Sequence, residues 1–305
     1  MRAVVFGYSE VGYRCLEVLL EAGVEIPLVL THEDDPGEER WFRSVADLAA
    51  RASIPTFTPN QVNSPAWVER VRETRPDCIF SFYYRKLLSR EMLDVAATGA
   101  FNMHGSLLPA YRGRCPVNWV LVHGETRTGV TLHEMVEQPD AGDIVGRRIV
   151  EIEASDDALS LSNRIAAEAA VLLRDLLPAL GTEQIERTPQ RLDEGSYYGG
   201  RGPEDGRIDW NRPALEIHNL VRAVTRPWPG AFTEFAGQRL FVWESSVVPG
   251  PRTAPPGTVA HGPCPVVACG EGGLILRRWQ LDGEKERDID EKWESANPIA
   301  GKRLG

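Results

Sequence analysis

The first 30 residues, MRAVVFGYSEVGYRCLEVLLEAGVEIPLVL (1–30), place two short apolar runs on either side of a helical pattern. Residues 4–6 and 26–30 have the continuous apolar character of strands that are buried on both faces. Between them, leucines and valines of 11–22 recur at the spacing of an amphipathic helix, which Gly23 ends. This strand–helix–strand order predicts a parallel sheet that is covered by helices.

The same alternation continues through the first two thirds of the chain. Further helical patterns occupy residues 45–49, 67–75 and 159–180, and further strand patterns occupy residues 78–82, 100–104 and 130–133. We therefore expect a Rossmann-like α/β fold, with a mostly parallel sheet and helices on both faces.

The pattern changes after a stretch rich in glycine, DEGSYYGGRGPEDG (193–206). Short strand-like runs separated by Gly and Pro follow it, which indicates a small β-rich domain resembling an OB barrel. We expect a catalytic domain over 1–192, a linker over 193–206 and a C-terminal domain over 207–305. Its last stretch, 283–305, is charged and poor in apolar residues, and is expected to be a loose tail.

Composition limits the function classes. The net charge of the 305 residues is −10, and the segment from Asp205 to the end is neutral, with 13 basic and 13 acidic residues. No basic domain is therefore present to bind nucleic acid. No apolar run of about 18 residues is present, so membrane insertion is not expected. The five cysteines form no C-x-x-C pair, which indicates free thiols and a cytoplasmic location.

Two apparent ligand motifs are weak. Gly7 and Gly12 follow the first strand, but the middle glycine of a dinucleotide motif is missing, so a tight turn is favoured. His104, His133 and Asp140 have no accompanying zinc-ligand spacing, so no metal is expected, and His133 is interpreted as a packing residue. The aromatic run FSFYY (80–84) is expected in the sheet core, with its last two positions left open.

Two polar clusters carry the chemistry. The stretch GAFNMHGSLLPAYRGRCPVNW (99–119) follows a strand and holds Asn102 and His104, and residues 134–143 follow another strand and hold Asp140. Polar groups at the strand ends of an α/β sheet indicate a ligand crevice. A carboxylate next to an imidazole raises the pKa of the imidazole. From the spacing alone, the alternative is that these polar residues belong to loops and only cap the ends of strands and helices.

FNMHGSLLP (101–109), followed by Arg112 and Gly113, resembles the core motif of folate-dependent formyltransferases. MVEQPDAG (135–142) is similar to their second motif, and RAVTRPWPGAF (222–232) to a C-terminal region shared with methionyl-tRNA formyltransferase. The resemblance implies 10-formyltetrahydrofolate as cosubstrate and Asn102, His104 and Asp140 as catalytic residues. His104 is expected to be held cationic by Asp140, so that it and Asn102 stabilise the tetrahedral oxyanion.

The resemblance also implies binding residues. Folate contacts map onto Lys86, Leu87, Leu88, Arg114, Val136, Glu137, Gln138, Pro139 and Asp140. Arg201, Arg222 and Arg226 are candidates for the phosphates of a sugar nucleotide, because a guanidinium matches phosphate oxygens. Surface arginines without a ligand are an equally good interpretation of these three.

THEDDPGE (31–38), FSFYYR (80–85) and YRGRCPVNW (111–119) are most similar to the formyltransferase part of the bifunctional enzymes that make UDP-4-deoxy-4-formamido-L-arabinose. This implies a UDP-amino sugar acceptor, a role in lipid A modification and resistance to cationic antimicrobial peptides. A separate decarboxylase chain would supply the amino sugar, and a homo-oligomer is compatible with the sequence. The alternatives are another nucleotide-linked amino sugar, methionyl-tRNA, or a non-enzymatic module that senses folate or nucleotide.

Overall fold

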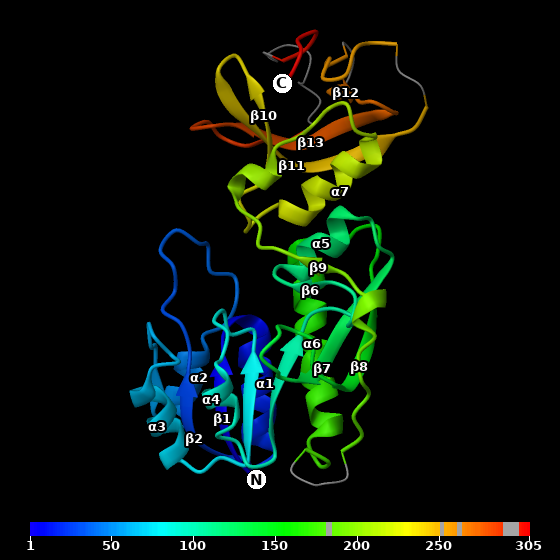
Figure 1. Cartoon of the computed structure of the whole chain (residues 1–305). Helices are drawn as coiled ribbons and strands as arrows, with labels where there is room; N and C mark the ends of the chain where they lie inside the picture. Colours follow the sequence, from blue (N-terminus) through cyan, green and yellow to red (C-terminus); the bar gives the residue numbers. More distant parts are fainter. Residues whose placement is uncertain (181–184, 251–252, 261–263, 289–298) are drawn as a thin grey trace. The chain divides into compact units, whose positions relative to one another are not determined.

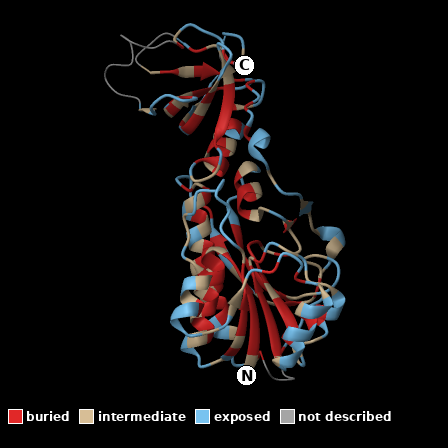
Figure 2. Ribbon diagram, turned by 90° about the vertical axis from the view of Figure 1, so that its left-hand side faces the viewer, coloured by how far each residue is buried: buried red, intermediate tan, exposed pale blue. Residues whose placement is uncertain are grey.

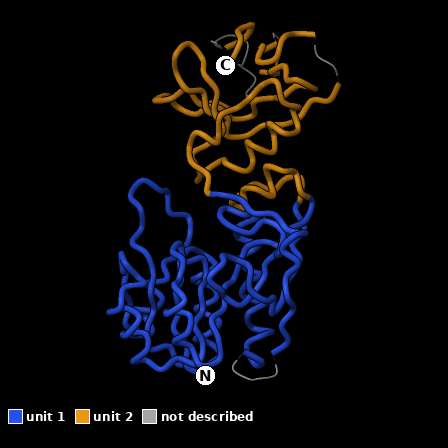
Figure 3. Tube along the Cα trace, in the orientation of Figure 1, with its two compact units in different colours: residues 1–116, 126–152, 161–199 blue, residues 117–125, 153–160, 200–305 orange. Residues whose placement is uncertain are grey.

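The computed structural model describes residues 1–180, 185–250, 253–260, 264–288 and 299–305. The chain forms two compact units (Figure 3). Unit 1 holds residues 1–116, 126–152 and 161–199, and unit 2 holds residues 117–125, 153–160 and 200–305. The change at residue 199 lies inside the stretch expected to be a linker. Two short segments of the expected first domain nevertheless belong to unit 2.

Unit 1 is built on a seven-stranded sheet of order β3-β2-β1-β4-β5-β7-β8 (Figure 1). The five strands from β3 to β5 pair in parallel, whereas β7 pairs antiparallel to both β5 and β8, so the expected mostly parallel sheet is confirmed. Its strands are β1 (Arg2–Gly7), β2 (Glu25–Leu30), β3 (Thr56–Phe57), β4 (Cys78–Phe82), β5 (Gly99–His104), β7 (Arg127–Glu134) and β8 (Ile144–Glu151).

Helices cover both faces of this sheet (Figure 2). Buried side chains of α3 and α4 join one core cluster with Val4, Phe6 and Ile79 of the sheet, while α1 packs on β1 and β4. Gly12 lies in α1, where a Cβ would crowd the carbonyl oxygen of Phe82, so its role is close packing. The helices that begin in the first 176 residues are α1 (Ser9–Glu21), α2 (Val45–Arg51), α3 (Pro65–Glu73), α4 (Arg90–Leu93), α5 (Pro116–Val122) and α6 (Ala158–Leu176).

The stretch expected to be a linker is ordered locally. It contains β9 (Tyr197–Tyr198), which pairs in parallel with β6 (Arg112–Gly113), and it overlaps two 3₁₀ turns, η1 (Leu192–Glu194) and η2 (Pro203–Gly206). The β6–β9 pair is important for the site because it fixes the backbone at Gly113.

Unit 2 contains an antiparallel half-barrel with strand order β10-β11-β13-β12 and β14 paired to β13. Within the described ranges, no pairing joins β10 to β12, so the strands form an open sheet. Its elements are α7 (Ala214–Val224), β10 (Ala231–Phe235), β11 (Gln238–Val248), β12 (Val266–Ala268), β13 (Gly273–Leu281) and β14 (Arg287–Asp288). Helix α7 packs on β11, and Trp279 of β13 is fully buried.

The prediction of a loose tail over 283–305 is wrong for the residues of this stretch that the structure describes. Residues 289–298 lie outside the described residues. Before them, β14 pairs with β13 and extends the sheet. After them, the amide of Leu304 donates to the carbonyl oxygen of Gly257 at 2.9 Å. Leu304 and Ile299 are buried, so burial of apolar side chains holds residues 299–305 against the rest of their unit.

None of the described helices is both long enough and apolar enough to cross a membrane.

Candidate active site

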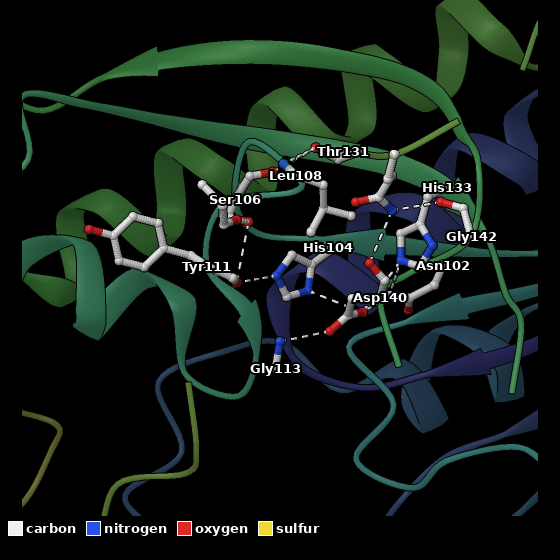
Figure 4. Close-up of polar contacts among 12 residues, drawn as sticks. Asn102, His104, Ser106, Leu108, Tyr111, Gly113, Thr131, His133, Asp140 and Gly142 are labelled. Atoms are coloured by element: carbon white, nitrogen blue, oxygen red, sulfur yellow. Dashed lines mark hydrogen bonds and ion pairs between the residues drawn. The ribbon is translucent and has the colours of Figure 1, made fainter. Parts of the chain in front are cut away.

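The site is built on one face of strand β5. Asn102 and His104 lie two residues apart on this strand, so their side chains share one face. Thr131 and His133 lie opposite His104 and Asn102 on the antiparallel neighbour β7. The loop between β7 and β8 then brings Asp140 over the same face (Figure 4).

The predicted catalytic residues meet around the Asp140 carboxylate. Its Oδ1 lies 3.5 Å from Nδ1 of His104 and 3.4 Å from Nδ2 of Asn102, and its Oδ2 accepts the amide hydrogen of Gly113 at 2.9 Å (Figure 4). The side chains of His104 and Asp140 are only 7% and 13% exposed. The structure therefore brings together all three residues in a largely desolvated cluster.

The backbone holds Asp140 in an unusual conformation. Its φ is +53°, in the left-handed region that aspartate tolerates better than most residues. The Gln190 side chain donates to the carbonyl oxygens of Asp140 and Gly142, at 3.0 and 2.6 Å. A Cβ at Gly142 would overlap the carbonyl of Glu134, so glycine is needed where the loop passes β7. These contacts fix the carboxylate before any substrate arrives.

Asp140 and His104 differ in their charge at neutral pH. Burial alone would raise the pKa of Asp140, but the charge that His104 carries when it is protonated and the hydrogen bond from the Gly113 amide outweigh burial and hold that pKa below its ordinary value. Burial lowers the pKa of His104, and the opposing effects of Asp140 and the Tyr111 carbonyl do not cancel that shift. At neutral pH the site therefore contains an ionised carboxylate and a neutral imidazole. The expectation that His104 is held cationic is wrong because desolvation exceeds the attraction of the carboxylate.

The neutral His104 ring faces two acceptors with one hydrogen. Its Nε2 lies 2.7 Å from the carbonyl oxygen of Tyr111, and its Nδ1 faces Asp140. A carbonyl and a carboxylate both only accept, so either position of the single hydrogen leaves one contact unsatisfied. The ring is therefore arranged to take up a second proton.

A family model described as "Formyl transferase" matches residues 1–177, and one described as "Formyl transferase, C-terminal domain" matches residues 202–297. The chain belongs to the formyl transferase family. Asn102, His104 and Asp140 all lie within the first matched range.

Solved structures share the fold at low sequence identity. The N-formyltransferase of Helicobacter canadensis, solved with folinic acid and dTDP-3-aminofucose, has a TM-score of 0.69 and 18% identity over 92% of this chain and 98% of its own. WlaRD, a sugar 3N-formyltransferase solved with dTDP and 5-N-formyl-THF, has a TM-score of 0.69 and 17% identity over 93% and 99%. A methionyl-tRNA formyltransferase from Clostridium thermocellum has a TM-score of 0.56 and 16% identity over 80% and 92%.

The segments expected to bind folate share one part of unit 1. Leu88 and Met135 both pack on the core cluster that contains Phe6 and Ile79. The Lys86 ammonium donates to the carbonyls of Pro59 and Asn60, which ties its side chain to the protein. Leu87 is 67% exposed. Further members of the expected set, Val136, Glu137, Gln138 and Arg114, are also exposed, and Pro139 is partly buried.

The three arginines expected to bind phosphate have partners inside unit 2. Arg226 pairs with Glu286 and lies over the ring of Trp243. Arg222 donates to Asn219 and to the carbonyl of Asp156, and burial lowers its pKa. Arg201 lies over the Trp119 ring, with a side-chain bond to the carbonyl of Asp205. Their assignment to a sugar nucleotide stays a prediction.

His133, interpreted from the sequence as a packing residue, is buried and lies in contact with two of the predicted catalytic residues. Its side chain is 2% exposed, and its Nε2 lies 3.1 Å from Nδ2 of Asn102 and 3.4 Å from Oδ1 of Asp140. The place of His133 in the cluster follows from the antiparallel register of β7 on β5, in which His133 lies opposite Asn102. The apolar pattern of residues 130–133 does not specify that register.

The first aromatic residues of the run at 80–84 lie in the sheet core, as expected. Phe80 and Phe82 are fully buried in the sheet. Tyr84, one of the positions left open, is also buried and stacks on His32 with ring centroids 4.2 Å apart. The other, Tyr83, has φ +58° and a buried hydroxyl that finds no hydrogen-bond partner within the described residues.

Proposed function

We propose that this chain is an N-formyltransferase that moves the formyl group of 10-formyltetrahydrofolate to the 4-amino group of UDP-4-amino-4-deoxy-L-arabinose. The observation that carries the formyl transfer is the convergence of Asn102, His104 and Asp140 in one buried cluster. The acceptor is supported by the resemblance of residues 31–38, 80–85 and 111–119 to the arabinose-modifying enzymes.

Asn102 serves as the donor to the reacting oxygen. Attack of the sugar amine on the formyl carbon forms a C–N bond and leaves negative charge on the former carbonyl oxygen. One Nδ2 hydrogen of Asn102 points at Asp140 across 3.4 Å, a long bond that a nearby oxyanion replaces easily. A preorganised donor of this kind contributes about 3–4 kcal/mol to transition-state stabilisation.

His104 serves as the base and then as the acid. The amine nitrogen becomes cationic on attack, and its proton moves to Nδ1 of the neutral His104 ring, next to Asp140. The resulting imidazolium satisfies both Tyr111 and Asp140. It then gives the proton to N10 of the folate as the bond between N10 and the formyl carbon breaks. The electrons of that bond remain on N10, so the cycle restores the neutral ring.

The residues at 86–88 and 135–140 suit a flat folate ring. The exposed side chains of Leu87 and Val136 supply apolar surface beside a rigid core. The Asn63 side chain accepts from the amide of Ser89 at 2.9 Å and donates to the carbonyl of Leu87 at 2.9 Å. These two hydrogen bonds hold residues 87–89 in one conformation next to the site.

The acceptor is tested directly by mass spectrometry. Enzyme and 10-formyltetrahydrofolate are incubated separately with the UDP-arabinose amine, a dTDP-3-amino sugar and initiator methionyl-tRNA. The expected product is a mass gain of one formyl group, with loss of one hydrogen, on the UDP sugar. Transfer to the dTDP sugar or to tRNA but not to the UDP sugar would refute the acceptor. His104→Ala with turnover like that of the wild type would refute the mechanism.

A further inference from the structure

His133 is a buried histidine that the steps above leave unused. It lies on β7 directly opposite Asn102, and its two ring nitrogens have different partners. Nδ1 is 2.6 Å from the carbonyl oxygen of Glu134, and Nε2 faces both Asn102 and Asp140 (Figure 4). The side chain is closed to solvent, so these contacts decide where its hydrogen resides.

The Glu134 carbonyl fixes the tautomer of the ring. A carbonyl oxygen only accepts, and a contact of 2.6 Å requires a hydrogen between the two atoms, so Nδ1 carries it. In a neutral ring Nε2 then presents a lone pair to the site. That lone pair accepts one hydrogen of the Asn102 amide at 3.1 Å.

This lone pair also decides which end of Asn102 enters the site. With Nδ2 inward, one hydrogen goes to His133 and the other lies toward Asp140. With the amide turned over, the Asn102 oxygen would face an imidazole lone pair and an ionised carboxylate, with no hydrogen among the three atoms. The inward nitrogen is therefore the stable arrangement.

We propose that His133 is a positioning residue that holds the Asn102 amide with its nitrogen toward the reacting carbonyl. It thereby presents a donor, rather than an acceptor, to the developing oxyanion. His133 keeps the hydrogen that it accepts at 3.1 Å, while the hydrogen held loosely by Asp140 turns to the oxyanion. This inference rests on the proposed formyl transfer for its kinetic consequence but not for the ring tautomer.

Two substitutions separate positioning from packing. His133→Met keeps an apolar side chain of similar length but has no strong acceptor, whereas the Oε1 of His133→Gln can accept from Asn102. We expect His133→Met to lower kcat about 100-fold, as loss of one oxyanion donor does. KM for both substrates should stay within about threefold, and His133→Gln should retain kcat within about tenfold. An unchanged kcat in His133→Met, or equal losses in both variants, would overturn the proposal.

A double-mutant cycle tests whether His133 acts through Asn102. In an Asn102→Ala background, adding His133→Met should cause no further loss of kcat, because the amide to be oriented is gone. Losses that multiply would mean that His133 acts by another route. Far-UV circular dichroism and a urea titration of each variant show whether a loss of activity is a loss of fold.

Imidazole NMR of the full-length wild-type protein gives a readout that needs no turnover. A long-range ¹H–¹⁵N correlation should show His133 protonated at Nδ1 and bare at Nε2. Any hydrogen on Nε2, in a neutral or a charged ring, would overturn the proposal. A wild-type enzyme that formylates none of the acceptors would instead refute the proposed function while leaving this spectrum to decide the role of His133.

Discussion

Replacement of Asp140 by Asn removes the charge that steadies the imidazolium of His104. Asp140 and His104 are 3.5 Å apart, and both side chains are almost excluded from water. Across this distance, at an effective dielectric of about 20, the attraction is roughly 5 kcal/mol. Each 1.36 kcal/mol is about tenfold in rate, so Asp140→Asn should lower kcat about 5,000-fold. The hydrogen bond from Gly113 can persist, because an amide oxygen also accepts.

The assay is kcat for formyl transfer, with Asp143→Asn as the matched control. Asp143 lies in the same loop and undergoes the same chemical change, but Asp140 is the carboxylate that contacts His104, so the kcat of Asp143→Asn should stay within about threefold of the wild type. The pH profile adds a second test. His104 must be neutral to act as a base, and burial lowers its pKa, so the acid limb of kcat/KM should lie below about pH 6.5. Asp140 opposes that lowering, so the limb should move to still lower pH in Asp140→Asn. A loss of less than tenfold, or an acid limb that moves upward, would refute the electrostatic reasoning.

Three further predictions concern stability. Tyr83→Phe should stabilise the protein by about 1 kcal/mol in urea titrations, because it removes a buried hydroxyl that has no partner among the described residues; destabilisation would contradict this. Gly142→Ala should lower both stability and kcat, because the added methyl group would meet the carbonyl of Glu134, and unchanged values of both would show that the loop can move aside. Burial lowers the pKa of His32 to about 4, and its Nε2 accepts from the amide of Arg85 at 2.9 Å. The unfolded chain binds this proton first, so stability should fall by about 1–2 kcal/mol, after allowance for solvent screening, as pH drops from about 6.5 toward 4, and by less in His32→Gln. Equal losses in both proteins would exclude His32 as the cause.

The parallel half of the fold was predictable because its strands are buried on both faces. Apolar runs such as those at 4–6 and 78–82 leave few alternatives to an internal strand, and the glycines and prolines between them end the helices. The direction of β7 was not predictable in the same way. Its apolar pattern is the same in either direction, and the reversed direction is shown by the register of β7 on β5, which runs from Phe101 opposite Glu134 to His104 opposite Thr131.

The site, too, was predictable only in part, because some of its properties follow from residue spacing and others depend on the folded surroundings. The spacing of Asn102 and His104 on one strand face follows from the sequence, and the motif resemblance added Asp140. The protonation of His104 does not follow, because it depends on how much water the surrounding chain removes from the ring. The loose tail expected over 283–305 is wrong for residues 283–288 and 299–305, which the structure describes, because β14 joins the sheet and Ile299 and Leu304 are buried.

The interleaving of the two units bears on how the protein can be cut and recombined. Segments 117–125 and 153–160 belong with residues 200–305, and the buried Asn118 side chain donates to the carbonyl of Ala223 at 2.7 Å. A fragment that starts at residue 200 would therefore lack part of its own interior. A chimaera that takes residues 200–305 from a relative would therefore also need that relative's segments 117–125 and 153–160. A single crossover near residue 200 would pack side chains of one protein against those of the other inside unit 2.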